Sequence, residues 1–260
     1  MYSGRSERSK IIDGGTRRWQ PGARMRDRLS LLALCVALAG GLESPSPGLA
    51  AGLAPGAAFP AVSAAQAPAV PRLRADFSGA PVSSDARRVA DWVVRSGDNR
   101  NLPYMIVDKA NARMFLFAAS GALLGDAPVL LGLARGDDSP PGIGDRPLAR
   151  IGPAERITPA GRFEAALGRN LAGQDILWVD YAAAISVHRA TDLKPGLSTA
   201  DRLARLASPS AADNRISHGC INVSAAVFER MIEPAFSGTS GVVYVLPETR
   251  SIHDEFPAAA

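Results

Sequence analysis

The sequence predicts a mainly β fold with a few short helices, and three observations support this class. Apolar runs of strand length recur between residues 103 and 247, turns rich in glycine, proline and aspartate separate them, and few stretches show the helical spacing of apolar residues. Several of the runs lie close together between residues 104 and 133, with only short connections between them. Short connections of this kind favour an antiparallel sheet.

The individual elements follow from the same patterns. Tyr104 to Val107 and Met114 to Phe117 flank Asp108 to Ala112, which indicates a hairpin. Serines in front of apolar stripes indicate helices, because a serine hydroxyl can accept a hydrogen bond from the first helical turn. The predicted strands are 104–107, 114–117, 127–133, 162–166, 175–181, 183–188 and 241–246, and the predicted helices are 86–95, 199–206 and 225–233.

The first 50 residues have the order of a secretory leader. A basic region precedes the uncharged run Leu29 to Leu42, and small residues follow it up to Ala50. This run is too short to span a bilayer, so we expect a signal peptide, a periplasmic or otherwise extracytoplasmic location, and no membrane span after signal removal.

The rest of the chain divides by composition. Residues 51–80 are rich in alanine and proline and almost free of charge, which predicts a flexible spacer. Residues 81–102 are expected to form a short helix and a connection, residues 103–250 the main domain, and residues 251–260 a polar tail.

The net charge of +4 belongs to the leader. Residues 1–50 hold 8 of the 29 lysines and arginines and 4 of the 25 acidic residues, so residues 51–260 hold 21 of each sign. A neutral domain lacks the basic surface on which nucleic-acid binding depends. The sequence therefore predicts no nucleic-acid partner.

The segment ISHGCINV, residues 216–223, stands out because the chain has only two cysteines and three histidines. If the leader is removed near Ala50, Cys35 leaves with it and Cys220 has no disulfide partner. A free thiol in an oxidising compartment suggests that its reactivity is used.

A cysteine reacts as the thiolate, so Cys220 needs a base or a positive charge close by. His218, two residues before it, and His188, at the end of a predicted strand, are both candidates for the base. Gly219 has no side chain, so a substrate carbonyl can approach the Cys220 N–H group, which is a plausible oxyanion donor.

Two other interpretations of the cysteine remain. A lone cysteine can be a small buried apolar residue. A zinc site could form from His188, His218, Cys220 and Asp213, although paired ligands at metal-site spacing are missing. We therefore expect no metal and no other cofactor, and His253 in the polar tail is interpreted as an exposed bystander.

Taken in order, these residues resemble a known family. A histidine at a strand end, the segment Ser217 to Asn222 (SHGCIN) and the upstream segment Thr158 to Phe163 (TPAGRF) resemble the catalytic domain of the L,D-transpeptidase (YkuD-type) family. The resemblance covers about residues 103–247. SHGCIN is its specific part and TPAGRF is supporting.

This resemblance implies a YkuD-like antiparallel β-sandwich with the active site in a cleft under a lid. It implies an exported cell-wall enzyme that joins peptidoglycan stem peptides through an acyl-enzyme thioester, with roles in cross-linking and cell shape. The family's cysteine nucleophile falls on Cys220 and its histidine base on His188. Ser217, His218 and Gly219 then shape the pocket and the oxyanion hole.

The chain departs from the family pattern in the spacing and at two positions. His188 and His218 are 30 positions apart, nearly twice the usual separation, because the segment 191–215 is inserted. Arg189 stands where a small residue is commoner, and Asn222 stands where many members have arginine, whose charge Arg215 could replace. Arg189, Asn222 and Arg215 are therefore the expected substrate-binding residues.

Alternative functions also remain on sequence grounds. The same acyl-enzyme could pass its acyl group to water, which would make the chain an L,D-carboxypeptidase or endopeptidase. A domain with this fold could also bind peptidoglycan without catalysis, as an envelope protein.

Overall fold

The computed structural model describes residues 74–190 and 198–259. The expected signal peptide and residues 51–73 of the expected spacer lie outside the described residues. Within the described ranges, no helix combines the length and the apolar character needed to cross a membrane.

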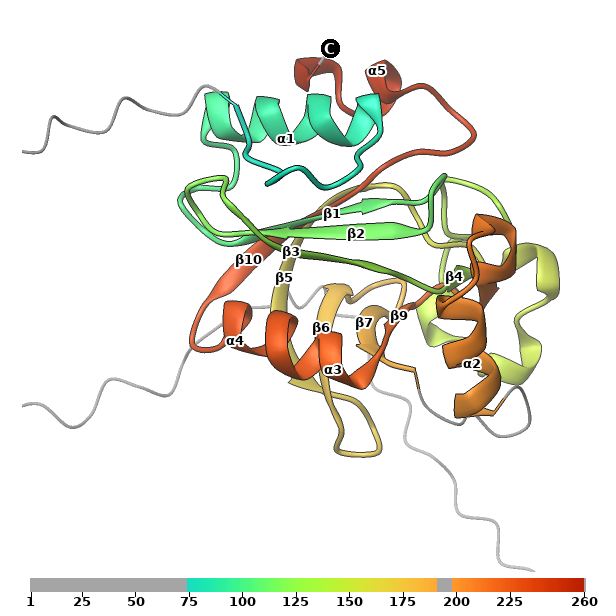
Figure 1. The fold of residues 1–260 in the computed structure, drawn as a ribbon. Helices are drawn as coiled ribbons and strands as arrows, with labels where there is room; N and C mark the ends of the chain where they lie inside the picture. Colours follow the sequence, from blue (N-terminus) through green and yellow to red (C-terminus); the bar gives the residue numbers. More distant parts are fainter. Residues whose placement is uncertain (1–73, 191–197, 260) are drawn as a thin grey trace, which may run out of the picture. The chain divides into compact units, whose positions relative to one another are not determined.

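The described residues form a mainly β fold with short helices, which confirms the predicted class (Figure 1). The strands are Tyr104–Asp108 (β1), Arg113–Phe117 (β2), Leu123–Pro128 (β3), Leu131–Gly132 (β4), Gly161–Arg169 (β5), Asp175–Asp180 (β6), Ile185–Arg189 (β7), Arg215–Ser217 (β8), Ile221–Val223 (β9) and Ser240–Val245 (β10). The helices are Ser84–Ser96 (α1), Thr199–Leu206 (α2), Ala225–Val227 (α3), Glu233–Phe236 (α4) and Ile252–Glu255 (α5), with a π-helical turn at Phe228–Ile232 between α3 and α4.

Short 3-10 turns complete the described elements. They are Ile143–Asp145, Leu148–Arg150, Pro153–Glu155, Ala211–Asn214 and Pro257–Ala259. The first three lie in the glycine- and proline-rich stretch between β4 and β5, where the sequence predicts no strand.

An eight-stranded sheet organises the fold, in the order β3-β2-β1-β10-β5-β6-β7-β9, and β4 pairs with β8 separately. Most neighbouring strands are antiparallel, as expected. The sheet is nevertheless mixed, because β10 runs parallel to β1 and β9 runs parallel to β7. Both β9 and β10 follow a long excursion of the chain from the strand they join, and such crossovers allow parallel pairing.

The third predicted strand, 127–133, is wrong in its bounds. The observed strand β3 covers Leu123–Pro128, and only Leu131–Gly132 of the remaining residues is extended and paired. Pro128 cannot donate a backbone hydrogen bond, which explains why the pairing with β2 stops there.

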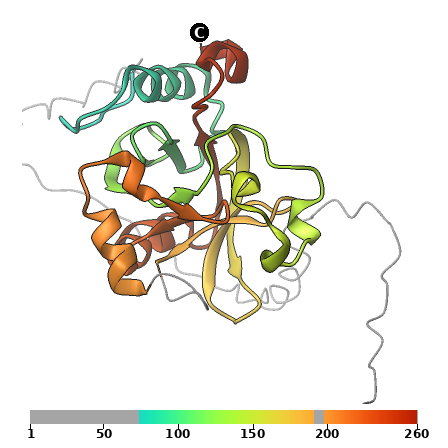
Figure 2. The ribbon, with the colours of Figure 1, turned by 90° about the vertical axis from the view of Figure 1, so that its right-hand side faces the viewer.

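Apolar side chains cover both faces of the sheet, because successive strand residues point in opposite directions. On β1, Met105 and Val107 belong to one buried cluster, which includes Phe228 of the π-helical turn. Tyr104 and Ile106 belong to a second cluster, which α1 covers. Figures 1 and 2 show α1 and the C-terminal residues together on the same side of the sheet.

The margins of the domain pack more tightly than the sequence predicts. Ala75 and Phe77, inside the expected spacer, and Ile252 and Phe256, inside the expected polar tail, are all buried in the cluster beneath α1. The Phe77 ring meets Phe115 edge-on, with the centroids 5.4 Å apart. The expected bounds of the spacer and the interpretation of residues 251–260 as a polar tail are therefore corrected: residues 75 and 77, and residues 252 and 256, contribute apolar side chains to the core.

Candidate active site

Strands β7 and β9 bring the two main site residues together. They pair in parallel with Val187 opposite Ile221 and His188 opposite Asn222, so Cys220, which directly precedes β9, lies beside β7. Cys220 is half-buried, and it is the free cysteine of the described residues.

Polar groups of β7 and the turn before it surround the sulfur. Ser186 Oγ donates toward Cys220 Sγ across 3.8 Å, and Sγ lies 3.6 Å from the carbonyl oxygen of Ala184. This is the polar surrounding of a reactive thiol rather than that of a small apolar core residue.

The Cys220 thiol and the His188 imidazole also shift each other's pKa. Burial by itself would raise the pKa of the thiol, but the side-chain contact with His188 and the charge of His188 bring that pKa below its ordinary value. Burial by itself would lower the pKa of His188, and the contacts with Cys220 and with the Arg189 carbonyl bring it above its ordinary value. Both directions favour proton transfer from sulfur to imidazole.

The ring of His188 is held by the backbone of the next residue. Nδ1 lies 2.8 Å from the carbonyl oxygen of Arg189. A carbonyl can only accept, so Nδ1 carries a proton and Nε2 is the nitrogen that can take one from a donor.

A tight turn connects β8 to the cysteine. Ser217 Oγ accepts a hydrogen bond from the Gly219 N–H at 3.0 Å and donates to the Cys220 carbonyl at 2.6 Å. Gly219 has a φ of +130°, and a Cβ atom there would lie 2.7 Å from the Ile157 carbonyl oxygen. Only glycine fits this position without strain or displacement of the backbone.

Thr158, from the TPAGRF segment, supports the same turn from behind. Its buried hydroxyl accepts a hydrogen bond from the Gly132 N–H and donates to the Gly219 carbonyl, both at 2.8 Å. The sequence marks this segment as a supporting motif, and the structure adds that its threonine connects β4 to the cysteine turn.

His218 is half-buried beside the cysteine turn. Burial lowers its pKa, and the positive charges of Arg156 and Arg202 lower it further. The sequence leaves both histidines open as the base, whereas in the structure His188 is the histidine whose contact shifts the pKa of the Cys220 thiol.

Asn222 lies behind the imidazole and is 1% exposed. Its Nδ2 is 3.0 Å from His188 Nε2, and its Oδ1 accepts a hydrogen bond from the Arg202 guanidinium at 2.9 Å. The contacts that the structure gives for the Asn222 side chain are therefore with His188 and Arg202, and its contact with substrate stays a prediction.

Arg202 is a site residue that the sequence analysis missed. It lies on α2, in the inserted segment, and shares the buried side of that helix with Leu206, four residues later. The sequence offers one signal for this placement. Arg202 and the apolar Leu206 are four residues apart on a predicted helix, and residues i and i+4 share a helix face.

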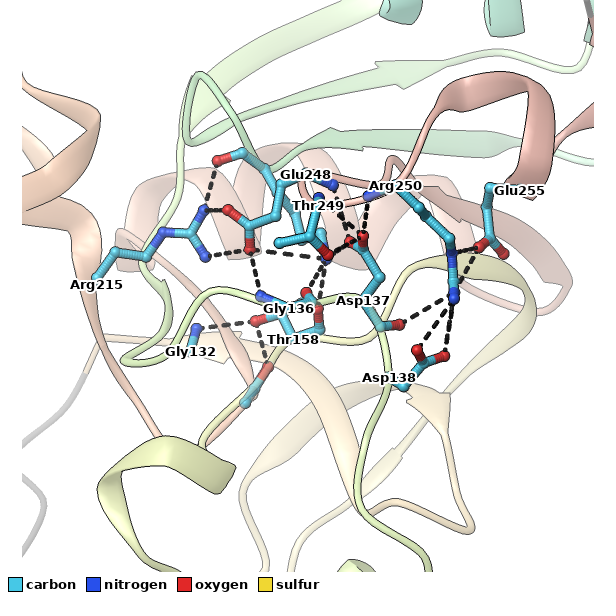
Figure 3. A network of polar contacts seen from close by, with 12 residues as sticks. Gly132, Gly136, Asp137, Asp138, Thr158, Arg215, Glu248, Thr249, Arg250 and Glu255 are labelled. Carbon is cyan, nitrogen blue, oxygen red and sulfur yellow. Dashed lines mark hydrogen bonds and ion pairs between the residues drawn. The ribbon is translucent and has the colours of Figure 1, made fainter.

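The Arg215 side chain is buried. Its guanidinium donates to both carboxylate oxygens of Glu248, at 3.0 and 2.5 Å, and to the Lys109 carbonyl at 2.8 Å, as Figure 3 shows in part. The Lys109 ammonium is itself fully buried and lies 2.7 Å from Asp137 Oδ1. The prediction for Arg215 is wrong, because its side chain belongs to a buried ionic network that joins β8 to the segment after β10.

The Arg189 side chain is also engaged elsewhere. Its guanidinium lies 3.0 Å from Glu229 and 3.6 Å from Glu233, and 4.3 Å above the Phe228 ring. The expected side-chain contact with substrate stays a prediction, and the contact that Arg189 makes with the site in this structure is through its backbone carbonyl.

The metal alternative receives no support from the contacts. The Asp213 carboxylate accepts a hydrogen bond from Ser208 at 2.6 Å. Over residues 74–190 and 198–259, no group of three or more histidines, cysteines, aspartates and glutamates could hold a metal ion. His253 lies exposed on α5.

Comparison with known proteins gives structural matches only. No protein-family model matches the chain, and no curated protein matches its sequence. The NMR structure of the catalytic domain of an Enterococcus faecium L,D-transpeptidase is 18% identical and covers 56% of this chain and 98% of that domain, with a TM-score of 0.31. An L,D-transpeptidase from Mycobacterium smegmatis is 15% identical and covers 55% of this chain and 58% of its own, with a TM-score of 0.32.

A third match is the helical cell shape determining protein from Campylobacter jejuni. It is 14% identical and covers 64% of this chain and 57% of its own, with a TM-score of 0.38. The chain thus spans little more than half the length of the M. smegmatis and C. jejuni structures. Solved L,D-transpeptidase domains are among the structures to which this chain is similar, and at these identities and TM-scores any assignment of activity depends on the site residues themselves.

Proposed function

We propose that the chain is a cysteine-dependent L,D-transpeptidase that acts on peptidoglycan stem peptides outside the cytoplasm. The observation that carries the proposal is the pairing of β7 with β9, which places Cys220 beside the strand of His188, where the two groups lower the pKa of the thiol and raise that of the imidazole. A half-buried thiol with a histidine partner on a neighbouring strand is the arrangement that covalent cysteine catalysis requires.

The reaction proceeds through a thioester. Cys220 transfers its proton to Nε2 of His188, and the sulfur attacks the peptide carbonyl that precedes the terminal D-alanine of a stem tetrapeptide. The C–N bond breaks, the departing amine takes the proton from His188, and an S–C bond links the acyl group to Cys220. An amine of a second stem then attacks the thioester, forms the new peptide bond and releases the sulfur.

The oxyanion donor in this proposal is the Cys220 N–H group. The Gly219 N–H already donates to Ser217 Oγ at 3.0 Å, so it is committed to the shape of the turn. The missing side chain at Gly219 lets the substrate carbonyl approach the Cys220 backbone.

A carbapenem tests the nucleophile. The full chain is prepared with Cys35→Ser in every variant, exposed to a carbapenem and measured by intact-protein mass spectrometry. The parent should gain one adduct mass, Cys220→Ala should gain none, and His188→Ala should acylate at least tenfold more slowly. His253→Ala, which changes an exposed histidine on α5, is the matched control and should acylate like the parent. An adduct on Cys220→Ala would exclude this nucleophile.

The acceptor is tested with purified stem peptides. Incubation with and without a free amine acceptor should give a cross-linked mass only when the amine is present. Loss of the terminal residue without any cross-linked product, even at high amine concentration, would assign the chain to the carboxypeptidase alternative.

A further inference from the structure

Arg202, which lies in the inserted segment between His188 and His218, contacts the site through its side chain. Helix α2 packs Leu206 against Leu130 and Ala190 in a small buried cluster. From the same side of α2, Arg202, which is 4% exposed, donates through a guanidinium nitrogen to Asn222 Oδ1 at 2.9 Å.

This contact determines which group is the donor and which is the acceptor in the hydrogen bond between Asn222 and His188. A guanidinium can only donate, so Oδ1 of Asn222 must face Arg202, and the Asn222 NH2 group must face His188 Nε2 at 3.0 Å. An NH2 group can only donate, so Nε2 must accept. At the other side of the ring, Nδ1 donates to the Arg189 carbonyl at 2.8 Å.

The three hydrogen bonds from Arg202 to the Arg189 carbonyl therefore have only one possible set of donors and acceptors. In that set Nε2 of His188 has no proton, so the imidazole is neutral. Protonation of Nε2 would place its N–H against the Asn222 NH2 group, so two donors would face each other. Rotation of the amide would turn its oxygen toward the imidazolium but would bring the NH2 group against Arg202.

We propose that Arg202 is a positioning residue: it fixes the orientation of the Asn222 amide and thereby holds His188 neutral in the resting protein, with its lone pair on Nε2. The inference rests on the proposed function only in taking Cys220 and His188 as the working pair. The Cys220 thiol and the Asn222 amide compete for the same lone pair, so the amide opposes the proton transfer that the contact with Cys220 favours.

Among residues 74–190 and 198–259, the ionisable groups from other elements that act on the His188 ring are the Cys220 thiol beside β9 and the Arg202 guanidinium on α2. On β7 itself, the Arg189 guanidinium is occupied by Glu229 and Glu233. Burial lowers the pKa of His188, the contacts with Cys220 and the Arg189 carbonyl bring it above its ordinary value, and the positive charge of Arg202 opposes that rise, in the same direction as the amide orientation.

The test is the pH profile of Cys220 alkylation by iodoacetamide, in the full chain carrying Cys35→Ser. Arg202→Leu removes both the donor and the charge, so the midpoint of the profile should fall by about 0.5–1 pH unit, which is roughly a three- to tenfold faster reaction below the midpoint. Arg202→Lys keeps a charged donor and should restore the parent midpoint. Arg205→Leu is the matched control on the same helix, because its guanidinium donates to the Asp213 carbonyl, and its profile should equal that of the parent.

Asn222→Asp provides an independent variant. It presents a carboxylate oxygen to Nε2 in either orientation, so its midpoint should fall even though Arg202 is present. Nitrogen NMR of the parent at neutral pH should show His188 neutral and protonated at Nδ1.

Parent-like midpoints in both Arg202→Leu and Asn222→Asp, with urea unfolding showing that the variants are folded, would overturn the proposal. An imidazolium in the resting parent would overturn it as well. If Arg202→Leu does not fold, Asn222→Asp and the NMR measurement decide. The two proposals can fail separately. If the parent protein gains no carbapenem adduct, the transpeptidase proposal is refuted, but the pH profile of Cys220 alkylation can still be interpreted because alkylation needs only the thiol.

Discussion

The Thr158 hydroxyl offers a direct test of how the cysteine turn is held. Thr158→Val replaces the hydroxyl with a methyl group of nearly the same size, so the change removes two hydrogen bonds without opening a cavity. The Gly132 N–H and the Gly219 carbonyl, both buried, lose this partner.

A buried polar group left without a partner costs about 1–3 kcal/mol, so two of them predict a loss of about 2–6 kcal/mol in the free energy of unfolding. For a domain of this size, that loss corresponds to a Tm lower by roughly 4–24 °C. Because the Gly219 carbonyl belongs to the turn that presents Cys220, carbapenem acylation should also slow.

Urea unfolding followed by fluorescence measures the first effect, and a mass-spectrometric time course measures the second. Thr239→Val, at an exposed threonine, is the matched control and should change the unfolding free energy by less than about 0.5 kcal/mol. A Thr158→Val protein with parental stability would refute the idea that this hydroxyl supports the turn.

Three further predictions concern the turn and the buried ionic network. Gly219→Ala strains a residue at φ +130° and places its Cβ 2.7 Å from the Ile157 carbonyl oxygen, so we expect a loss of about 1–3 kcal/mol and at least tenfold slower acylation; an unchanged acylation time course would contradict this. Lys109→Met leaves the buried Asp137 carboxylate without its cation and should cost about 3–5 kcal/mol in urea unfolding, and an unchanged urea midpoint would argue against the network as a stabilising element. Burial alone would raise the pKa of Asp137, but hydrogen bonds from Lys109 and Thr249 hold that pKa well below its ordinary value, so its stabilisation is complete above the unfolded-state pKa of about 3.9 and is lost as the pH falls below it. Unfolding free energies measured between pH 6 and pH 2 should show this decline in the parent and a weaker one in Asp137→Asn; parallel curves would contradict it.

The sequence predicts the local elements and the reactive pair because these depend on short-range patterns. Strand and helix periodicity locate β1, β2, α1 and α2, and the SHGCIN segment marks Cys220 together with a histidine at a strand end. Which histidine lies beside the thiol depends on the pairing of β7 with β9, and that pairing is a property of the assembled sheet. The structure therefore supplies the argument for proposing His188 rather than His218 as the base.

The partners of the polar residues around Cys220 and His188 are not predictable from the sequence. Arg215 is five positions before Cys220, yet its partners are Glu248 and the Lys109 carbonyl, 33 and 106 positions away. Arg202 is further from the motif along the chain, yet it reaches Asn222 across 20 positions because α2 folds back over β9. Distances along the chain carry no information about such contacts, which the topology creates.

The burial of the C-terminal residues is also not predictable from the sequence. Ile252 and Phe256 are four residues apart, which is helical spacing, but in a short segment with neighbouring charges this pattern is too weak to outweigh the polar composition. Their burial depends on α1, almost 160 residues earlier in the chain.

The place of β10 in the sheet affects how the protein is made. This strand lies between β1 and β5, so it joins the three strands on one side to the four strands that carry His188 and Cys220 on the other. During synthesis or export the chain emerges from its N-terminus, and the two partial sheets must wait, with their inner edges unpaired, until residues 240–245 arrive. Open strand edges are sites of aggregation, and pairing between such distant segments is slow. A chaperone that shields these edges would therefore raise the yield of folded protein.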